Sequence, residues 1–308
     1  MLLLTNLGNT TNFLSLKLGS SVHNTAIWGS ASTGTCSIVF GVSPDGYDAV
    51  NSQEIAGDVH SIAWAPNGRN LHALDSHSSG SLLTSITNFR MSEDPNLQDV
   101  VGIDVLGNVT SASQIVAHPT ETLMYIVTKE SNELIVVSLA GDTLLSNSTP
   151  VLRYRLLPTS LDASQFQSSS LAISASRNTL WALSQSSLQA VITAFTLNVT
   201  TGEVVDVAAR ASWRGTGEGQ LTAAPFDGGD VVAITDSPTA YITILGLDQS
   251  TLPSARIAED SGLHDYLYAM QVDERKRKDI QMAAPKIKSY GRVFVDDHVN
   301  LGDCAWID

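Results

Sequence analysis

The side chains that could carry chemistry in this sequence are a histidine, two carboxylates and several neutral hydrogen-bonding groups, each near the start of a strand-like segment. His60 precedes the apolar run 61–64, and Glu218 lies two residues before Gln220 and the run that follows it. An imidazole titrates near neutral pH and a carboxylate can share its proton transfers, so His60 and Glu218 are the candidate acid/base residues. Three more polar residues begin other strands of this kind: Ser113, Ser169 and Asp303.

Amide, ammonium and aromatic side chains complete the candidate set. Gln185, Gln220 and Lys129 carry N–H donors that could polarise a carbonyl oxygen of a substrate. These groups, with a single imidazole, suit a neutral conjugated substrate better than a polyanion. Three residues in or beside adjoining loops could contact a flat ligand: Trp28, Trp213 and Arg214.

Cysteine usage and motif spacing argue against a metal site. The sequence has only Cys36 and Cys304, which excludes a cysteine-based zinc site, and no Gly-rich phosphate loop follows a strand. No His or Cys cluster has the spacing of metal ligands. We therefore expect no cofactor. The two cysteines could form a disulfide in an oxidising compartment, or they could be two buried free thiols.

A repeated unit of roughly fifty residues must position these groups. Each copy has an apolar strand, a turn that often holds a proline, and a second apolar strand; Pro66, Pro119, Ala175 and Pro225 are equivalent positions. A unit of this length holds four short strands and their loops, which is one blade of a β-propeller. The pattern therefore predicts an all-β propeller in which the first strands of the units surround a central pocket.

The expected propeller is a single domain over residues 1–308 with six blades, or seven as the alternative. Residues 303–306 repeat the pattern of the first strand of a unit, and the runs 24–28 and 37–40 would supply the strands that follow it. The ring would then close by pairing of N- and C-terminal strands. We expect an irregular insertion around residues 258–300.

Charge bears on the partners and the compartment. The 31 acidic against 17 basic residues give a formal net charge of −14, which repels nucleic acid and anionic lipid, so a small-molecule substrate is the expected partner. No run of about 18 apolar residues is present. The oligomeric state is open. Four sequons and the possible disulfide slightly favour a secreted glycoprotein: Asn9, Asn108, Asn147 and Asn198.

Three stretches resemble the fungal carboxy-cis,cis-muconate cyclases, or 3-carboxymuconate lactonising enzymes. This resemblance covers roughly residues 26–308 and implies a propeller that lactonises its substrate without a cofactor, using a His, a Glu and carboxylate-binding arginines. The stretches are 116–120 with Tyr125, 188–195, and 232–236 with 305–308.

The residues that this family uses are mostly replaced here. Its two arginines fall on Ser113 and on or near Gln185, its glutamate falls on Lys129, and His60 matches its histidine only if one blade of the family is absent. By analogy with relatives of this propeller type, we expect a cofactor-independent cyclase of fungal secondary metabolism, for example a hetero-Diels–Alderase acting on a quinone-methide-like intermediate. The alternatives are a muconate-type lactonising enzyme, a non-catalytic propeller that binds a small molecule or protein, and a metal-dependent sugar-lactone hydrolase.

Overall fold

The computed structural model describes residues 10–17, 25–31, 36–43, 46–54, 59–65, 70–75, 83–91, 98–120, 123–140, 143–144, 152–214, 219–226, 230–236, 241–248 and 286–295. These residues form strands and turns, with one short 3-10 helix at Ala163–Gln165. Within these ranges, no helix has the length and apolarity needed to cross a membrane. The expectation of an all-β chain is confirmed.

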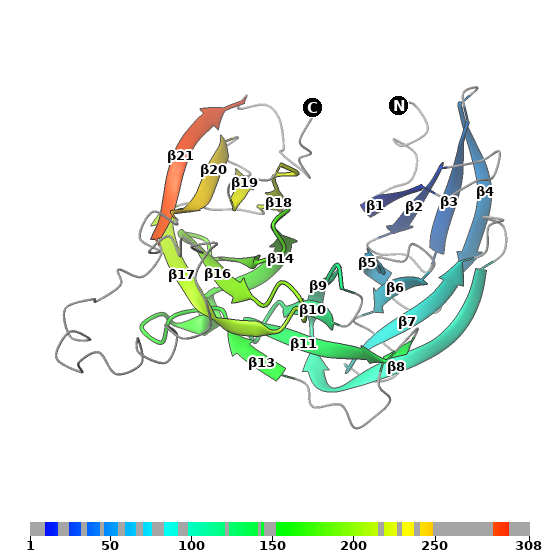
Figure 1. Cartoon of the computed structure of the whole chain (residues 1–308), viewed down its shortest axis with the longest axis horizontal. Coiled ribbons are helices and arrows are strands. Elements are labelled where there is room, and N and C mark those ends of the chain that lie inside the picture. Colours follow the sequence, from blue (N-terminus) through cyan, green and yellow to red (C-terminus); the bar gives the residue numbers. More distant parts are fainter. Residues whose placement is uncertain are drawn as a thin grey trace, which may run out of the picture.

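Five antiparallel sheets follow one another in chain order around an arc (Figure 1). The first contains β1 (Thr10–Lys17), β2 (Thr25–Ala31), β3 (Cys36–Ser43) and β4 (Gly46–Glu54). The second contains β5 (Val59–Trp64), β6 (Asn70–Asp75), β7 (Leu83–Met91) and β8 (Gln98–Thr110). The third contains β9 (Ala112–Ala117), β10 (Leu123–Thr128) and β11 (Glu133–Ala140), and β11 also pairs with β12 (Thr143–Leu144) and β13 (Leu152–Arg155).

The last two sheets have the same up-and-down order. The fourth contains β14 (Gln167–Ile173), β15 (Thr179–Gln185), β16 (Gln189–Leu197) and β17 (Val204–Arg214). The fifth contains β18 (Leu221–Ala223), β19 (Val231–Asp236), β20 (Tyr241–Asp248) and β21 (Lys286–Phe294). Each copy of the repeat found in the sequence forms the first two strands of one sheet, which confirms the propeller.

The described residues form five sheets where the repeat predicted six or seven blades. Residues 10–17 supply the innermost strand of the first sheet, the place that the sequence analysis gave to 303–306. Residues 303–306 lie outside the described part of the chain. Lys286–Phe294 is a strand inside the predicted insertion, and it pairs with β20 on both sides of one β-bulge.

The core lies between the sheets rather than within one of them. Residues of neighbouring sheets share three hydrophobic clusters, so strands such as β10 and β15 are covered on both faces and read as nearly continuous apolar runs. Pairs that show this are Leu74 with Ile126, Tyr125 with Leu180, and Trp181 with Ile234.

One kind of hydrogen bond recurs between successive innermost strands, and we call these the inner-strand hydrogen bonds. Ser61 Oγ accepts from the backbone N–H of Ile115 at 3.1 Å, and Ser170 Oγ accepts from that of Leu221 at 2.9 Å. Between them, Gln114 Oε1 accepts from the N–H of Leu171. The three acceptors occupy equivalent positions of the repeat, so the second, third and fourth sheets each satisfy a backbone donor of the next one.

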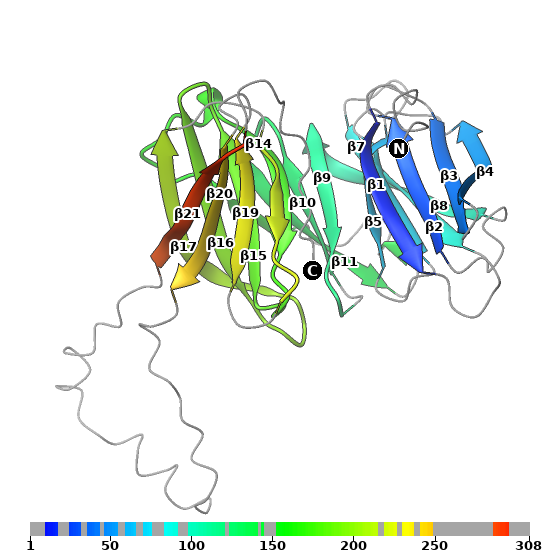
Figure 2. The ribbon, with the colours of Figure 1, turned by 90° about the horizontal axis from the view of Figure 1, so that it is seen from above.

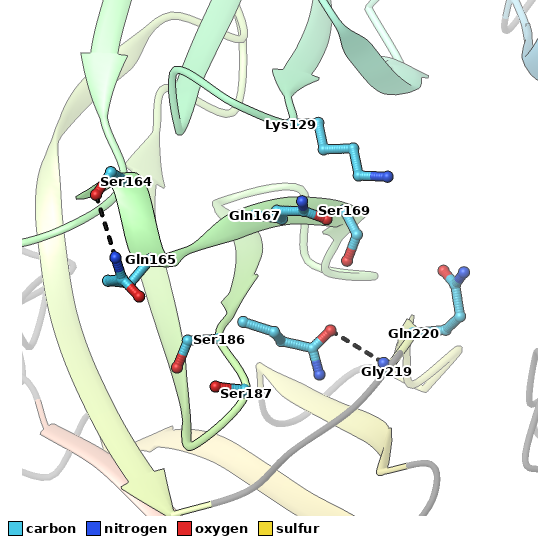
Figure 3. A pocket seen from close by; sticks show the side chains of 10 residues that line it. Lys129, Ser164, Gln165, Gln167, Ser169, Ser186, Ser187, Gly219 and Gln220 are labelled. Carbon is cyan, nitrogen blue, oxygen red and sulfur yellow. Dashed lines mark hydrogen bonds between the residues drawn. The ribbon is translucent and has the colours of Figure 1, made fainter. Parts of the chain in front are cut away.

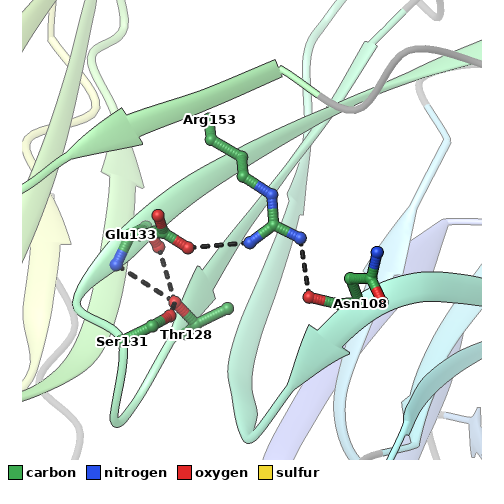
Figure 4. Close-up of polar contacts among 5 residues, drawn as sticks. All are labelled: Asn108, Thr128, Ser131, Glu133 and Arg153. Carbon is green, nitrogen blue, oxygen red and sulfur yellow. Dashed lines mark hydrogen bonds and ion pairs between the residues drawn. The ribbon is translucent and has the colours of Figure 1, made fainter.

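Arg153 makes a further connection between the second and third sheets and also forms an exposed ion pair within the third sheet (Figure 4). Arg153 Nη1 donates to Glu133 Oε2 at 2.8 Å, and Arg153 Nη2 donates to the carbonyl of Asn108 at 2.6 Å. Asn108 has a positive φ of 60°, a conformation that asparagine tolerates better than most residues. Arg153 therefore links β13 and β11 to the outer strand β8.

Candidate functional site

A cavity of about 540 Å³ opens where the third, fourth and fifth sheets meet (Figure 3). Its volume lies in the usual range of small-molecule sites. Apart from Lys129 and Gly219, every described lining residue carries a neutral amide or hydroxyl group. The lining residues are Lys129, Ser164, Gln165, Gln167, Ser169, Gln185, Ser186, Ser187, Gly219 and Gln220.

Lys129 supplies the positive charge of this cavity. It follows β10, and its backbone N–H donates to the carbonyl of Ser111 at 2.7 Å while its carbonyl accepts from the N–H of Ser168 at 3.1 Å. These bonds hold the turn against both the third and the fourth sheet. Figure 3 shows the exposed side chain extending toward the space that Ser169 and Gln220 also face.

Gln185 and Gly219 fix the far side of the cavity. The N–H of Gly219 donates to Gln185 Oε1 at 3.0 Å, so the side-chain amide has a defined orientation and presents its donors from Nε2. A Cβ at Gly219 would lie 2.3 Å from the carbonyl oxygen of Thr235 and 2.7 Å from Gln185 Nε2. Only glycine allows the backbone to approach both groups this closely.

Gln220 is held by its backbone, which leaves its side chain to the cavity. Its N–H donates to Thr235 Oγ1 at 3.0 Å, and its carbonyl accepts from the N–H of Thr235 at 3.1 Å. Figure 3 shows the amide of Gln220 on the same open side as Lys129. Both residues can therefore contact one ligand.

Two serines of the predicted rim have different roles. Ser113 Oγ donates to the carbonyl of Ser168 at 2.8 Å, so it connects the third and fourth sheets and is not among the lining residues. Ser169 lines the cavity, and its Oγ is shielded from solvent with no hydrogen-bond partner in the described ranges. A shielded hydroxyl without a partner costs free energy that a ligand group could offset.

The structure brings together four residues of the predicted site, Lys129, Ser169, Gln185 and Gln220, but it places Trp213 and Arg214 elsewhere. These two end the strand β17, which continues to Arg214 instead of giving way to a loop, and they line a separate cavity. His60 lies on β5, as expected, whereas Trp28 lies in the middle of β2 and not in or beside a loop; the side chains of both are outside what the structure describes. Glu218, Asp303 and the Cys304 partner of the possible disulfide also lie outside the described residues.

Sequence reasoning missed six lining residues, one of which, Gly219, directly precedes the predicted Gln220. Ser186 and Ser187 follow the second strand of a repeat, so projecting that loop onto the same rim would have found them. Gln167 begins β14, whereas Ser164 and Gln165 belong to the 3-10 helix, for which the repeat contains no signal.

Across the described ranges no group of three or more His, Cys, Asp and Glu residues could hold a metal ion. Asn108 and Asn198 are exposed, which a glycosylation site requires, whereas Asn9 and Asn147 lie outside the described residues.

Comparison with known proteins gives a fold rather than a family. No protein-family model and no curated protein matches the chain. A solved candidate 6-phosphogluconolactonase of Bacteroides uniformis matches with a TM-score of 0.58 and 14% identity, over 75% of this chain and 66% of that one. The periplasmic gluconolactonase of Pseudomonas aeruginosa matches with a TM-score of 0.55 and 16% identity, over 73% and 63%.

Kluyveromyces lactis Hsv2 matches with a TM-score of 0.54 and 11% identity, over 94% of this chain and 74% of that one. The chain spans about two thirds of the length of the two lactonase-type structures. At these identities the likeness shows a β-propeller fold, and two of the three solved structures named are of the lactonase type.

Proposed function

We propose that this chain is a propeller enzyme of lactone chemistry, which forms or opens the ring ester of a small hydroxylated carboxylic acid in the cavity around Lys129. The observation that carries the proposal is the lining of that cavity: neutral amides and hydroxyls with one ammonium group. From the sequence alone, lactone chemistry is the alternative to the first expectation, which is cyclisation of a conjugated substrate.

The lining matches a hydroxylated ligand with a single negative charge. Hydroxyl and amide side chains each donate and accept, as the hydroxyls of a sugar acid do. Lys129 offers one partner for a carboxylate, and no described lining residue would repel it. In a chain with a net charge of −14, one lysine suits a monocarboxylate or its lactone better than a tricarboxylate.

The chemistry follows from where charge develops. Opening a lactone adds water across the acyl C–O bond and places negative charge on the carbonyl oxygen before the bond breaks. The ammonium of Lys129 and the Nε2 donors of Gln185 are the groups that would stabilise this charge. In the reverse direction, the same groups would hold the carboxyl group while the substrate hydroxyl attacks its carbon and water leaves. In a muconate-type lactonisation, they would hold the carboxylate beside the alkene carbon that it attacks.

Proton transfer needs an acid/base residue, and we propose His60 and Glu218 for it. Glu218 directly precedes Gly219, which lines the cavity, and His60 lies on the innermost strand of the second sheet. Replacement of either residue by alanine should lower turnover at least about tenfold if it carries the step. The gluconolactonase names of two structural relatives support the substrate class at the level of the fold.

The test compares lactone and lactonisation substrates with matched lysine variants. Hydrolysis of glucono-1,5-lactone and 6-phosphogluconolactone is followed by acid release, and cyclisation of 3-carboxymuconate by its ultraviolet absorbance. Lys129→Gln should lower kcat/KM at least about tenfold. Lys288→Gln, the same change on β21 away from the cavity, should leave it unchanged. Equal activity of the two variants, or no turnover of any of the three substrates, would contradict the proposal.

A second candidate remains the hetero-Diels–Alder cyclisation of a quinone-methide-like intermediate. The observation that favours it is the neutral character of the lining, since amides such as Gln185 and Gln220 can polarise a carbonyl without a charge. Such a reaction should depend on Gln185 and tolerate Lys129→Gln. Ligand binding without turnover of any of these substrates would favour a non-catalytic propeller.

A further inference from the structure

A second cavity of about 300 Å³ lies between the outer strands of the fourth and fifth sheets. The outermost strands β17 and β21 are in contact; they follow one another along the outer edge of the arc in Figure 1 and run beside each other in Figure 2. This cavity shares no lining residue with the one around Lys129. Its lining residues are Ala211, Ser212, Trp213, Arg214, Thr243, Leu245, Ile287, Ser289 and Arg292.

A β-bulge places the lining residues of β21 on one face. Side chains alternate along a strand, so Ile287 and Ser289 share a face that Arg292 would not share in a regular strand. The pairing with β20 shifts at Ile244 and Leu245, and Tyr290 has no opposite residue. After this shift Arg292 pairs with Thr243, on the same face as Ser289.

The inner wall of the cavity is apolar. Leu245 is a buried member of the cluster shared by the fourth and fifth sheets, and Trp213 and Ile287 are half-buried against that cluster. The indole of Trp213 therefore has one side supported by the core. Aromatic side chains held in this way pack well against a flat apolar ligand.

The rim carries two positive charges. Arg214 and Arg292 both line the cavity and are exposed, and no Asp or Glu is among its described lining residues. The guanidinium of Arg292 lies over the ring of Tyr241, 3.9 Å from its centroid, which restrains the plane of the fork. In a chain with 31 acidic residues, two arginines beside an apolar wall form a local site for an anion.

We propose that this cavity binds a flat aromatic molecule with one carboxylate. The ring would pack on Trp213, Leu245 and Ile287, and the carboxylate would accept from the guanidinium groups of Arg214 and Arg292. Planar guanidinium forks match a carboxylate in geometry as well as in charge. The hydroxyls of Ser212, Thr243 and Ser289 supply neutral donors at the same rim.

The experiment measures binding of 2-naphthoate by titration calorimetry on the full chain, with 2-naphthalenemethanol as the uncharged control. We expect the alcohol to bind at least about tenfold more weakly than the acid, because it lacks the charge-assisted hydrogen bonds. Arg214→Gln, Arg292→Gln and Trp213→Leu should each weaken 2-naphthoate by a similar factor. Arg292→Lys should recover only part of the loss, because it keeps the charge without the fork.

Two controls separate this site from the cavity around Lys129 and from unfolding. Lys129→Gln should leave naphthoate binding unchanged, so failure of the proposed enzymatic function leaves this inference untouched. Far-ultraviolet circular dichroism of each variant checks that the propeller is intact. Undetectable binding of 2-naphthoate, equal affinity for acid and alcohol, or full affinity in the double variant Arg214→Gln/Arg292→Gln would overturn the proposal.

Discussion

Replacing Ser170 by alanine removes one inner-strand hydrogen bond. The side chain is fully buried, and its Oγ accepts from the N–H of Leu221 at 2.9 Å. Without it, the backbone donor of Leu221, a residue only 7% exposed, loses its partner. A buried donor left in this way costs about 1–3 kcal/mol, which is a large share of the stability of a typical domain.

The assay is equilibrium unfolding in urea, followed by circular dichroism and by tryptophan fluorescence. Ser170→Ala should lower the free energy of unfolding by about 1–3 kcal/mol. Ser160→Ala, the same change on an exposed turn residue, should stay within about 0.5 kcal/mol of the parent. Ser61→Ala removes the equivalent bond to Ile115 and should cost a similar amount.

The double variant tests whether these bonds act independently. The bonds from Ser61 and Ser170 join different pairs of sheets and share no partner, so their costs should add to within about 0.5 kcal/mol. If Ser170→Ala matched the exposed control, the inner-strand hydrogen bonds would not contribute measurably to stability. The presence of hydrogen-bond acceptors at the equivalent positions Ser61 and Ser170 would then need an explanation other than stability.

Three further predictions concern pH, packing and charge. Burial lowers the pKa of His118 from its usual 6.5, so the unfolded chain binds the proton more readily than the folded chain. The free energy of unfolding should therefore fall as the pH drops below 6.5. His118→Gln should reduce this dependence of the melting temperature on pH in thermal melts. Gly219→Ala should lower the free energy of unfolding by about 1–3 kcal/mol, because its Cβ would overlap the carbonyl oxygen of Thr235. Ala223→Gly is the control in a binding assay, where it should leave ligand binding in the cavity unchanged. A double-mutant cycle on Glu133 and Arg153 should give a coupling below about 1 kcal/mol that weakens with salt, since the pair is exposed.

The sequence predicted the strands where hydrophobic period and turn chemistry agree. Copies of the repeat at β9–β10 and β14–β15 combine apolar runs with a turn, and the structure places strands there. The first sheet was harder, because Thr10–Lys17 begins with three polar residues, has no long apolar run and has no proline turn. Its innermost strand was therefore assigned to another part of the chain.

The candidate site was predictable as far as the repeat extends. Gln185 and Gln220 stand at strand ends of successive copies, so their positions follow from the fold. Trp213 and Arg214 look like loop residues beside Gly215, but β17 continues to Arg214 and carries them to the outer rim. The number of residues in an outer strand depends on its pairing partner, which periodicity does not report.

The geometry of the cavity depends on contacts between sheets more than on any single sheet. The carbonyl of Lys129 accepts from Ser168 of the fourth sheet, and the N–H of Gly219 donates to Gln185 across the next boundary. The inner-strand bond from Ser170 fixes Leu221, the residue after Gln220. Ser170→Ala should therefore weaken ligand binding in the cavity although Ser170 does not line it. Unchanged binding in a destabilised Ser170→Ala protein would show that the turns around Lys129 and Gly219 hold the site without help from the inner strands.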